Sequence, residues 1–258
     1  MKIVVLVKEV PDTWGDRRLD LETGLADRAA SEAVLDEIGE RSLEVALSYA
    51  DAHPGTEVAV VSMAPATATT TVRKALAMGA GSAVQIVDDA LHGADYVLTA
   101  EVLAAAIRRT GFDLVVAGNL STDGTGGVVP AMVAELLGVP QLTALTSVEI
   151  AEDAVSGSRA SDAGTMTVSA PLPALVSITE ALPDARFPNF KGIMAAKKKP
   201  FETVSLEDLG IDAEDPQAAR SIVVSLAQKP PREAGVKIVD DGDGGQKLAE
   251  FLVSNRLA

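Results

Sequence analysis

Short, continuous apolar runs recur along the first part of the chain, and they constrain the possible folds more than any other feature of the sequence. They are rich in Val, Ile and Leu, and they lie at residues 3–7, 58–63, 83–87, 114–117 and 142–150. A continuous apolar run, unlike an alternating one, is expected for a strand buried on both faces, as the strands of parallel sheets are. These runs therefore predict a central, mostly parallel sheet.

The stretches between these runs carry the apolar spacing and the end signals of helices. We predict helices at residues 31–52, 69–78, 94–109 and 130–137, with Ser31 as the N-cap of the first. Each predicted helix is followed closely by a glycine, the residue that most often ends a helix. Strands that alternate with helices at this spacing predict an α/β fold, with a doubly wound, mostly parallel sheet and helices on both faces.

The pattern changes after residue 150. Short pieces in which polar and apolar residues alternate lie at residues 149–155 and 165–170, and an apolar run follows at 175–179. Alternation is typical of antiparallel strands with one face in water. We therefore predict a small antiparallel extension of the sheet.

The end of the chain reads differently from the rest. From Gln228 it carries two consecutive prolines and an acidic glycine run before a short predicted helix at residues 246–255. Such a segment cannot form a core alone, so it is either disordered or wrapped on another molecule. We predict one α/β domain at residues 1–227 and a C-terminal arm at residues 228–258.

Composition excludes several classes of function. The formal net charge is −15, which argues against nucleic-acid binding and against attachment to anionic lipid. Without cysteine there is no disulfide, thiol nucleophile or iron–sulfur ligand. The two histidines, His53 and His92, stand in unrelated contexts. We therefore predict no metal site, and a Ser–His–Asp triad would be hard to build.

The sequence also carries no membrane signal. The apolar run at residues 3–7 is followed at once by Lys8 and Glu9, so it is too short for a signal peptide. No later segment reaches the roughly 18 uninterrupted apolar residues of a membrane span. We expect a cytoplasmic protein with no direct membrane insertion.

The most informative segment is the glycine loop, which we define as residues 118–130. It follows a predicted strand and opens a predicted helix, and it reads Gly118-Asn-Leu-Ser-Thr-Asp-Gly-Thr-Gly-Gly-Val-Val-Pro130. The N–H groups of Gly126, Gly127 and Val128 would point out of the helix start, as a phosphate site requires. The loop is neither a GxGxxG motif nor a Walker A motif. It is therefore either a phosphate site or a flexible surface turn.

The position of the glycine loop favours a ligand, because α/β sheets bind ligands at the carboxyl ends of their strands. Two other predicted strand ends converge there, at Leu6 and Met63. Their backbone groups could meet the edge of an adenine, although ordinary strand termination is the more common explanation of each strand end taken alone. Lys8 is the one cation that the sequence places near the loop.

A second candidate site lies at residues 186–200, which we call the docking segment. In it Phe190 stands between Pro188 and Gly192, in a predicted loop. An aromatic residue projected by such a loop can anchor a protein partner, or it can fold back onto its own domain. The three lysines at residues 197–199 are a local basic exception in an acidic chain, and they suit either a solvated face or an electrostatic contact.

These segments, in this order, resemble the beta subunits of electron transfer flavoproteins. The resemblance lies in the opening Met1-Lys-Ile-Val-Val-Leu-Val-Lys-Glu-Val-Pro-Asp12, in Arg73-Lys-Ala-Leu-Ala-Met-Gly-Ala80 and in the glycine loop. It is most specific in Gly192-Ile-Met-Ala-Ala-Lys-Lys-Lys199 and in Pro230-Pro-Arg-Glu-Ala-Gly-Val-Lys237. It covers nearly the whole chain.

The resemblance implies a partner, two cofactors and a set of binding residues. A larger alpha subunit would carry the redox FAD, and this chain would hold a structural AMP in a nucleotide-binding domain. The chain would have no catalytic residue and no enzymatic activity by itself. The matching positions of the nucleotide site are Leu6, Asp36, Glu37, Ile38, Gly39, Met63, Gly118, Asn119, Asp123, Gly124, Thr125, Gly126, Gly127, Val128 and Val129.

The resemblance also implies how the chain meets its partners. The docking segment would bind client dehydrogenases such as acyl-CoA dehydrogenases through Phe190, Ile193, Met194 and Lys197, and a quinone oxidoreductase or other acceptor would receive the electrons. The arm would wrap the alpha subunit. One departure is Asp36-Glu-Ile-Gly39, where many relatives carry an Asn-Pro-Phe type of stretch. Some relatives place a second FAD where others hold AMP, so both nucleotides stay open.

Two rival functions belong to other classes. A stand-alone enzyme that acts on adenine nucleotides needs cations or metal carboxylates at the phosphate, and the glycine loop offers only Asp123. A nucleotide sensor without a redox partner has no use for a long wrapping arm. Purification with and without a co-expressed partner separates these functions.

Overall fold

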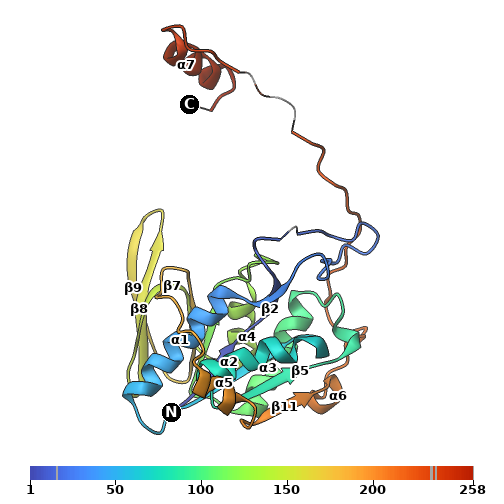
Figure 1. Cartoon of the computed structure of the whole chain (residues 1–258), viewed down its shortest axis with the longest axis vertical. Coiled ribbons are helices and arrows are strands. Elements are labelled where there is room, and N and C mark those ends of the chain that lie inside the picture. Colours follow the sequence, from blue (N-terminus) through green and yellow to red (C-terminus); the bar gives the residue numbers. More distant parts are fainter. Residues whose placement is uncertain (16, 233–234, 236, 258) are drawn as a thin grey trace. The chain divides into compact units, whose positions relative to one another are not determined.

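A computed structural model describes residues 1–15, 17–232, 235 and 237–257, shown in Figure 1. The chain forms two compact units, Met1–Val224 and Ser225–Ala258. Across the described part of the chain, none of the helices combines the length and the apolar character that a membrane crossing requires.

The first unit is built on one nine-stranded sheet with the order β11-β5-β4-β1-β6-β10-β7-β8-β9. The strands from β11 to β7 run parallel, and β8 and β9 extend the sheet as an antiparallel hairpin. The strands are β1 (Lys2–Leu6), β4 (Glu57–Met63), β5 (Ser82–Ile86), β6 (Leu114–Gly118), β7 (Gln141–Ile150), β8 (Ala154–Ser161), β9 (Gly164–Pro171), β10 (Ala174–Ile178) and β11 (Phe201–Val204).

Helices cover both faces of this sheet, so the doubly wound α/β prediction is confirmed. On one face α1 (Glu37–Ala52), α2 (Thr69–Met78) and α5 (Phe190–Ala196) contribute to a first apolar core. On the other face α3 (Tyr96–Thr110), α4 (Val129–Leu137) and α6 (Leu206–Leu209) contribute to a second. Two short 3₁₀ helices, η1 (Ala66–Ala68) and η2 (Asp89–Leu91), follow β4 and β5.

The start of the first helix was predicted wrongly. Asp36, and not Ser31, is the N-cap of α1, because its side chain accepts the N–H of Ile38. The residues before it form β3 (Ala33–Leu35), which pairs antiparallel with β2 (Glu9–Pro11). Leu35 is buried in the first core, so this stretch is more stable as a strand than as an extra helical turn.

The region after residue 183 is also more regular than the sequence predicts. The docking segment contains α5, and β11 and α6 follow it. Strand β11 is added in parallel to the edge strand β5, a long-range pairing with no local signal. A capping box between Ser205 and Asp208 begins α6.

Among its described residues the second unit holds one helix, α7 (Gly244–Ser254), which confirms the short helix predicted near the end of the chain. Leu248, Phe251 and Val253 of this helix are exposed. The predicted motif at residues 230–237 falls partly outside the described residues, because Glu233, Ala234 and Val236 are not among them.

Candidate functional site

A cleft of about 530 Å³ opens at the carboxyl ends of β1, β4, β5 and β6. Ligand sites in proteins have volumes of this order. Strand β1 lies between β4 and β6. The chain passes from β1 to β4 and β5 on one side and then crosses to β6 on the other side of β1, so the direction in which strands are added reverses at β1. Such a switch point is where open α/β sheets bind nucleotides. A larger hollow of about 730 Å³ includes Met1, Thr56 and Asp113, near the amino ends of the strands, away from the glycine loop.

The cleft brings together most of the residues predicted to bind a nucleotide. Its lining includes Leu6, Asp36, Gly39, Met63, Gly118, Asn119, Gly124, Gly126, Gly127 and Val129. Glu37, Ile38, Asp123, Thr125 and Val128 lie outside this lining. Ile38 is buried and packs on Gly118, where an added Cβ would lie 2.7 Å from its Cγ2 atom. Ile38 therefore packs α1 against β6, and contact of these five residues with a nucleotide stays a prediction.

The backbone of the glycine loop requires small residues. A Cβ atom on Gly126 would lie 2.3 Å from the hydroxyl of Tyr96, which is closer than any real contact. Gly127 has a φ of 68°, in the left-handed region that glycine adopts without strain. The loop thus passes directly under the Tyr96 ring, and its backbone forms a wall of the cleft.

The start of α4 has the features of an anion site. Among the described residues, none caps this helix with its side chain. Its first N–H groups and the positive end of its dipole are therefore available to a negatively charged group. Two buried oxygens of the same loop, Asn119 Oδ1 and Thr122 Oγ1, find no hydrogen-bond partner in the described part of the chain. Since buried polar atoms are normally paired, these oxygens indicate room for a ligand or for water.

Asp36 connects helix α1 to the glycine loop. One carboxylate oxygen accepts the N–H of Ile38 at 3.3 Å, and the other accepts the N–H of Thr122 at 2.9 Å. Burial raises the pKa of Asp36 above its ordinary value, although these two N–H groups act in the opposite direction. The side chain therefore holds the loop in place, in addition to lining the cleft.

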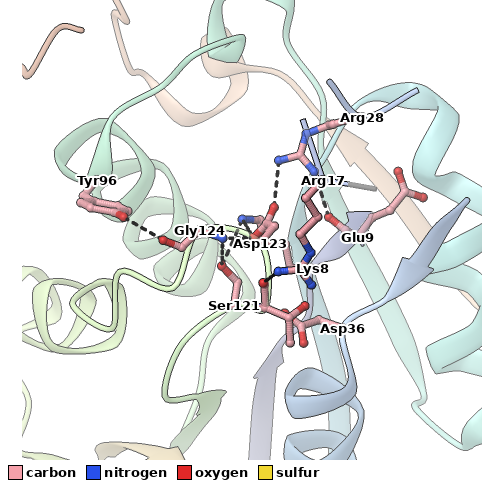
Figure 2. A network of polar contacts seen from close by, with 10 residues as sticks. Lys8, Glu9, Arg17, Arg28, Asp36, Tyr96, Ser121, Asp123 and Gly124 are labelled. Carbon is pink, nitrogen blue, oxygen red and sulfur yellow. Dashed lines mark hydrogen bonds and ion pairs between the residues drawn. The ribbon is translucent and has the colours of Figure 1, made fainter. Parts of the chain in front are cut away.

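A network of charged groups surrounds Asp123, beside the cleft (Figure 2). Lys8 Nζ lies 2.7 Å from one carboxylate oxygen of Asp123, and Arg28 Nη2 lies 3.2 Å from the other. Arg17 donates to the carbonyl oxygen of Thr122 in the same loop. The prediction that Lys8 is the one nearby cation was wrong, because the connection between β2 and β3 folds back and brings Arg17 and Arg28 to the loop.

The network keeps Asp123 ionised. Burial would by itself raise the pKa of this carboxyl group, but the hydrogen bond and charge of Lys8 outweigh it and lower the pKa to about 2. A carboxyl group whose pKa is lower in the folded state stabilises the fold above its unfolded pKa, and this contribution is lost as the pH falls through the folded pKa.

We expect Asp123→Asn to lower the free energy of unfolding by about 1–2 kcal/mol near neutral pH, a value reduced for the solvent exposure of Lys8 and Arg28. The difference from the natural protein should be constant above pH ~5 and should shrink between pH ~4 and ~2, where Asp123 takes up its proton. Urea unfolding at a series of pH values measures it. Asp162→Asn, at an exposed turn, is the control. A difference that does not change with pH would contradict this origin.

The docking segment exposes its predicted anchor. Phe190 is 80% exposed, so the alternative in which it folds back into its own domain is wrong for this structure. It lies at the first residue of α5 and not in a loop, because Asn189 caps that helix. Ile193, Met194 and Lys197 are exposed as well. Phe187, 92% exposed, was missed although it has the same proline-flanked context.

Lys199 has a structural role that the sequence did not reveal. Its Nζ donates to the carbonyl oxygens of Leu76, Gly79 and Ala80 at 2.7–3.1 Å, where helix α2 ends. A cation at the C-terminus of a helix is stabilising. The solvated basic group of this segment is therefore Lys197 and Lys198.

Comparison with known proteins identifies the family. The model of the electron transfer flavoprotein domain matches residues 23–209. Electron transfer flavoprotein subunit beta of Mycobacterium tuberculosis is 45% identical over 262 residues, which cover 99% of this chain and 98% of that protein. This chain belongs to the electron transfer flavoprotein beta subunits.

Two further proteins are similar to this chain over nearly its whole length. The beta subunit of Bacillus subtilis is 33% identical, covering 98% of this chain and 96% of its own. The caffeyl-CoA reductase-Etf complex subunit CarD of Acetobacterium woodii is 34% identical, and the match covers 98% of this chain and 97% of that protein. Electron transfer flavoprotein beta subunits are electron transfer proteins. Within the described residues, no group of three or more His, Asp or Glu side chains could hold a metal ion.

Proposed function

We propose that this chain pairs with an electron transfer flavoprotein alpha subunit and holds AMP in the cleft at the carboxyl ends of β1, β4, β5 and β6. One observation carries the nucleotide part of the proposal. The start of α4, which has no side-chain cap among the described residues, and Asn119, whose buried side-chain oxygen finds no partner among them, both belong to the lining of this cleft, at the switch point of the sheet. In this arrangement the phosphate lies at the start of α4, and the adenine lies near the ends of β1 and β4, at Leu6 and Met63.

The AMP in this proposal is structural and undergoes no reaction. The cations near the glycine loop are engaged with protein groups, Lys8 and Arg28 with Asp123 and Arg17 with Thr122. A bound FAD in the alpha subunit would supply the redox chemistry, and the protein would supply position and electrostatics. In this proposal the beta subunit therefore has no catalytic site of its own. We also propose that the carrier works in the cytoplasm.

Client dehydrogenases, such as acyl-CoA dehydrogenases, bind the docking segment in this proposal, and a quinone oxidoreductase or another acceptor takes up the electrons. The exposed aromatic side chains of this segment support the proposal, because exposed Phe is otherwise a cost in solubility. Three lysines of the same segment, Lys191, Lys197 and Lys198, are also exposed.

Co-expression with the alpha subunit tests the proposal. We expect a yellow heterodimer from which denaturation releases FAD and AMP in equal amounts. Two molecules of FAD per heterodimer would show that the cleft holds FAD. A colourless chain that is stable alone and turns over adenine nucleotides would favour a stand-alone enzyme, and one that only binds them would favour a sensor.

We expect Phe190→Ala to weaken the binding of a client dehydrogenase about thirtyfold, since truncating an aromatic anchor costs roughly 2 kcal/mol or more. The melting temperature should change little, because the side chain buries little surface in its own domain. Titration of the heterodimer with the client measures the affinity, and Leu136→Ala, an exposed position on α4, is the control. Unchanged affinity would remove Phe190 from the contact.

A further inference from the structure

Arg186 is the first residue of the docking segment, and it is bound to helix α1 by an unusual number of contacts. Its Nε and Nη2 atoms donate to the two carboxylate oxygens of Glu44, each at 2.8 Å, and its backbone N–H donates to Glu44 at 2.9 Å. A further nitrogen, Nη1, lies 2.8 Å from Asp51. Two-pronged pairs of this kind fix geometry as well as charge.

The Glu44 carboxylate is mostly shielded from water, which makes this contact stronger than a surface ion pair. Its side chain is 16% exposed. Burial alone would raise the pKa of Glu44, but the hydrogen bonds from Arg186 reverse the shift and lower it. The carboxylate therefore stays ionised at neutral pH, and the link between α1 and the docking segment persists.

Other contacts fix the rest of the segment. The Asn189 side chain accepts the N–H of Gly192 at 2.8 Å. A Cβ atom on Gly192 would lie 2.3 Å from the carbonyl oxygen of Ala77, so the glycine lets α5 approach the end of α2 closely. Arg73 donates to the carbonyl oxygen of Ala196 at 3.1 Å. Each of the two exposed aromatics, Phe187 and Phe190, thus directly follows a residue that is held in place.

We propose that Arg186 is a positioning residue for electron uptake. Held by Glu44 and Asp51, it fixes the direction in which Phe187 and Phe190 leave the surface, so that both enter the client dehydrogenase together. This inference rests on the proposed function of the docking segment. It adds Arg186, Glu44, Asp51 and Phe187 to the residues on which docking depends.

Charge indicates which part of the client faces the segment. Arg186 carries one positive charge and pairs with both Glu44 and Asp51, so this cluster keeps one net negative charge. The same segment carries three exposed lysines, Lys191, Lys197 and Lys198, and no acidic residue, so it is basic in a chain whose net charge is −15. The matching surface of the client is therefore an apolar pocket with an acidic rim.

The test uses Glu44→Gln in the intact heterodimer, with steady-state reduction by a client dehydrogenase and its substrate. We expect the KM for the carrier to rise about tenfold, which corresponds to the loss of one charge-assisted hydrogen bond, with kcat unchanged. Arg186→Lys, which keeps the charge and loses the two-pronged geometry, should raise KM by less. Phe187→Ala, which leaves the ion pair intact, should raise KM as well.

Amide hydrogen exchange gives a readout that does not depend on the client. In Glu44→Gln, exchange in residues 187–195 should become faster, while α4 and the glycine loop keep their protection. Glu101→Gln is the matched control, because Glu101 forms the same kind of two-pronged pair with Arg220. It should change neither KM nor exchange in the docking segment.

The outcomes separate the inference from the proposed function. If Glu44→Gln and Glu101→Gln have the same KM for the carrier, Arg186 does not position the contact with the client. This conclusion holds even if amide hydrogen exchange in residues 187–195 becomes faster. If exchange is unchanged, the anchor itself is not held by Glu44. If the natural heterodimer accepts no electrons from any dehydrogenase, the docking function fails, and the positioning role of Arg186 fails with it.

Discussion

Deleting residues 228–258 is expected to abolish stable assembly with the alpha subunit and to leave the α/β domain folded. The two apolar cores of the sheet consist of residues that precede this segment. The deleted part contains α7, on which the exposed Leu248 and Phe251 lie three residues apart and therefore share one helix face, with Leu252 beside them. Burying these side chains on another chain is the simplest way to stabilise the arm.

Co-elution of the two subunits in size-exclusion chromatography measures this result, and circular dichroism checks the fold of the truncated chain. Phe251→Asp in the full chain is the milder variant, and it should weaken assembly without removing it. Leu257→Asp, beyond the end of α7, is its control. A truncated chain that holds the alpha subunit as tightly as the full chain would show that the arm is not the wrapping element.

Replacing Gly126 by Val is expected to remove most of the bound nucleotide. The new Cβ atom would lie 2.3 Å from the Tyr96 hydroxyl, so either the half-exposed Tyr96 side chain must turn away or the loop must shift. Gly126 also lines the cleft, so in either case the Val side chain would occupy space in which the nucleotide is proposed to lie. We expect the purified variant to contain little AMP and to assemble poorly.

Chromatography of the nucleotide released by denaturation gives the AMP content per chain. Thr165→Val is the control, because it places a β-branched apolar side chain at an exposed position of strand β9. Thr165 lies outside the cleft lining and outside the predicted nucleotide site, so this variant should keep its AMP. Full AMP content in Gly126→Val would remove the glycine loop from the nucleotide site.

The sequence predicts those parts of the fold that local signals specify. Helix α2 was predicted with the bounds that it has, because Gly79, with a φ of 149°, ends it after a clear apolar period. Strand β4 follows from its continuous apolar run in the same way. The cleft could be predicted because open α/β sheets bind ligands at the carboxyl ends of their strands, and the glycine loop follows one of those strands.

The parts that were missed depend on contacts between distant segments. Strand β11 has only four residues, too few for a periodic signal, and its pairing with β5 decides its structure. Arg28 reaches Asp123 across a connection of irregular structure, and no spacing in the sequence encodes that approach. Ser31 failed as a cap because the pairing of β3 with β2 competes for the same residues.

Rapid mixing of the heterodimer with a reduced client dehydrogenase tests the central claim most directly. The visible absorbance of the FAD reports its reduction, and a quinone oxidoreductase added afterwards reports its reoxidation. We predict that the flavin is reduced by the client and reoxidised by the acceptor, while the AMP content stays constant. The account would be contradicted by a flavin that no dehydrogenase reduces and no acceptor reoxidises. It would also be contradicted by a chain that purifies without any flavin-bearing partner.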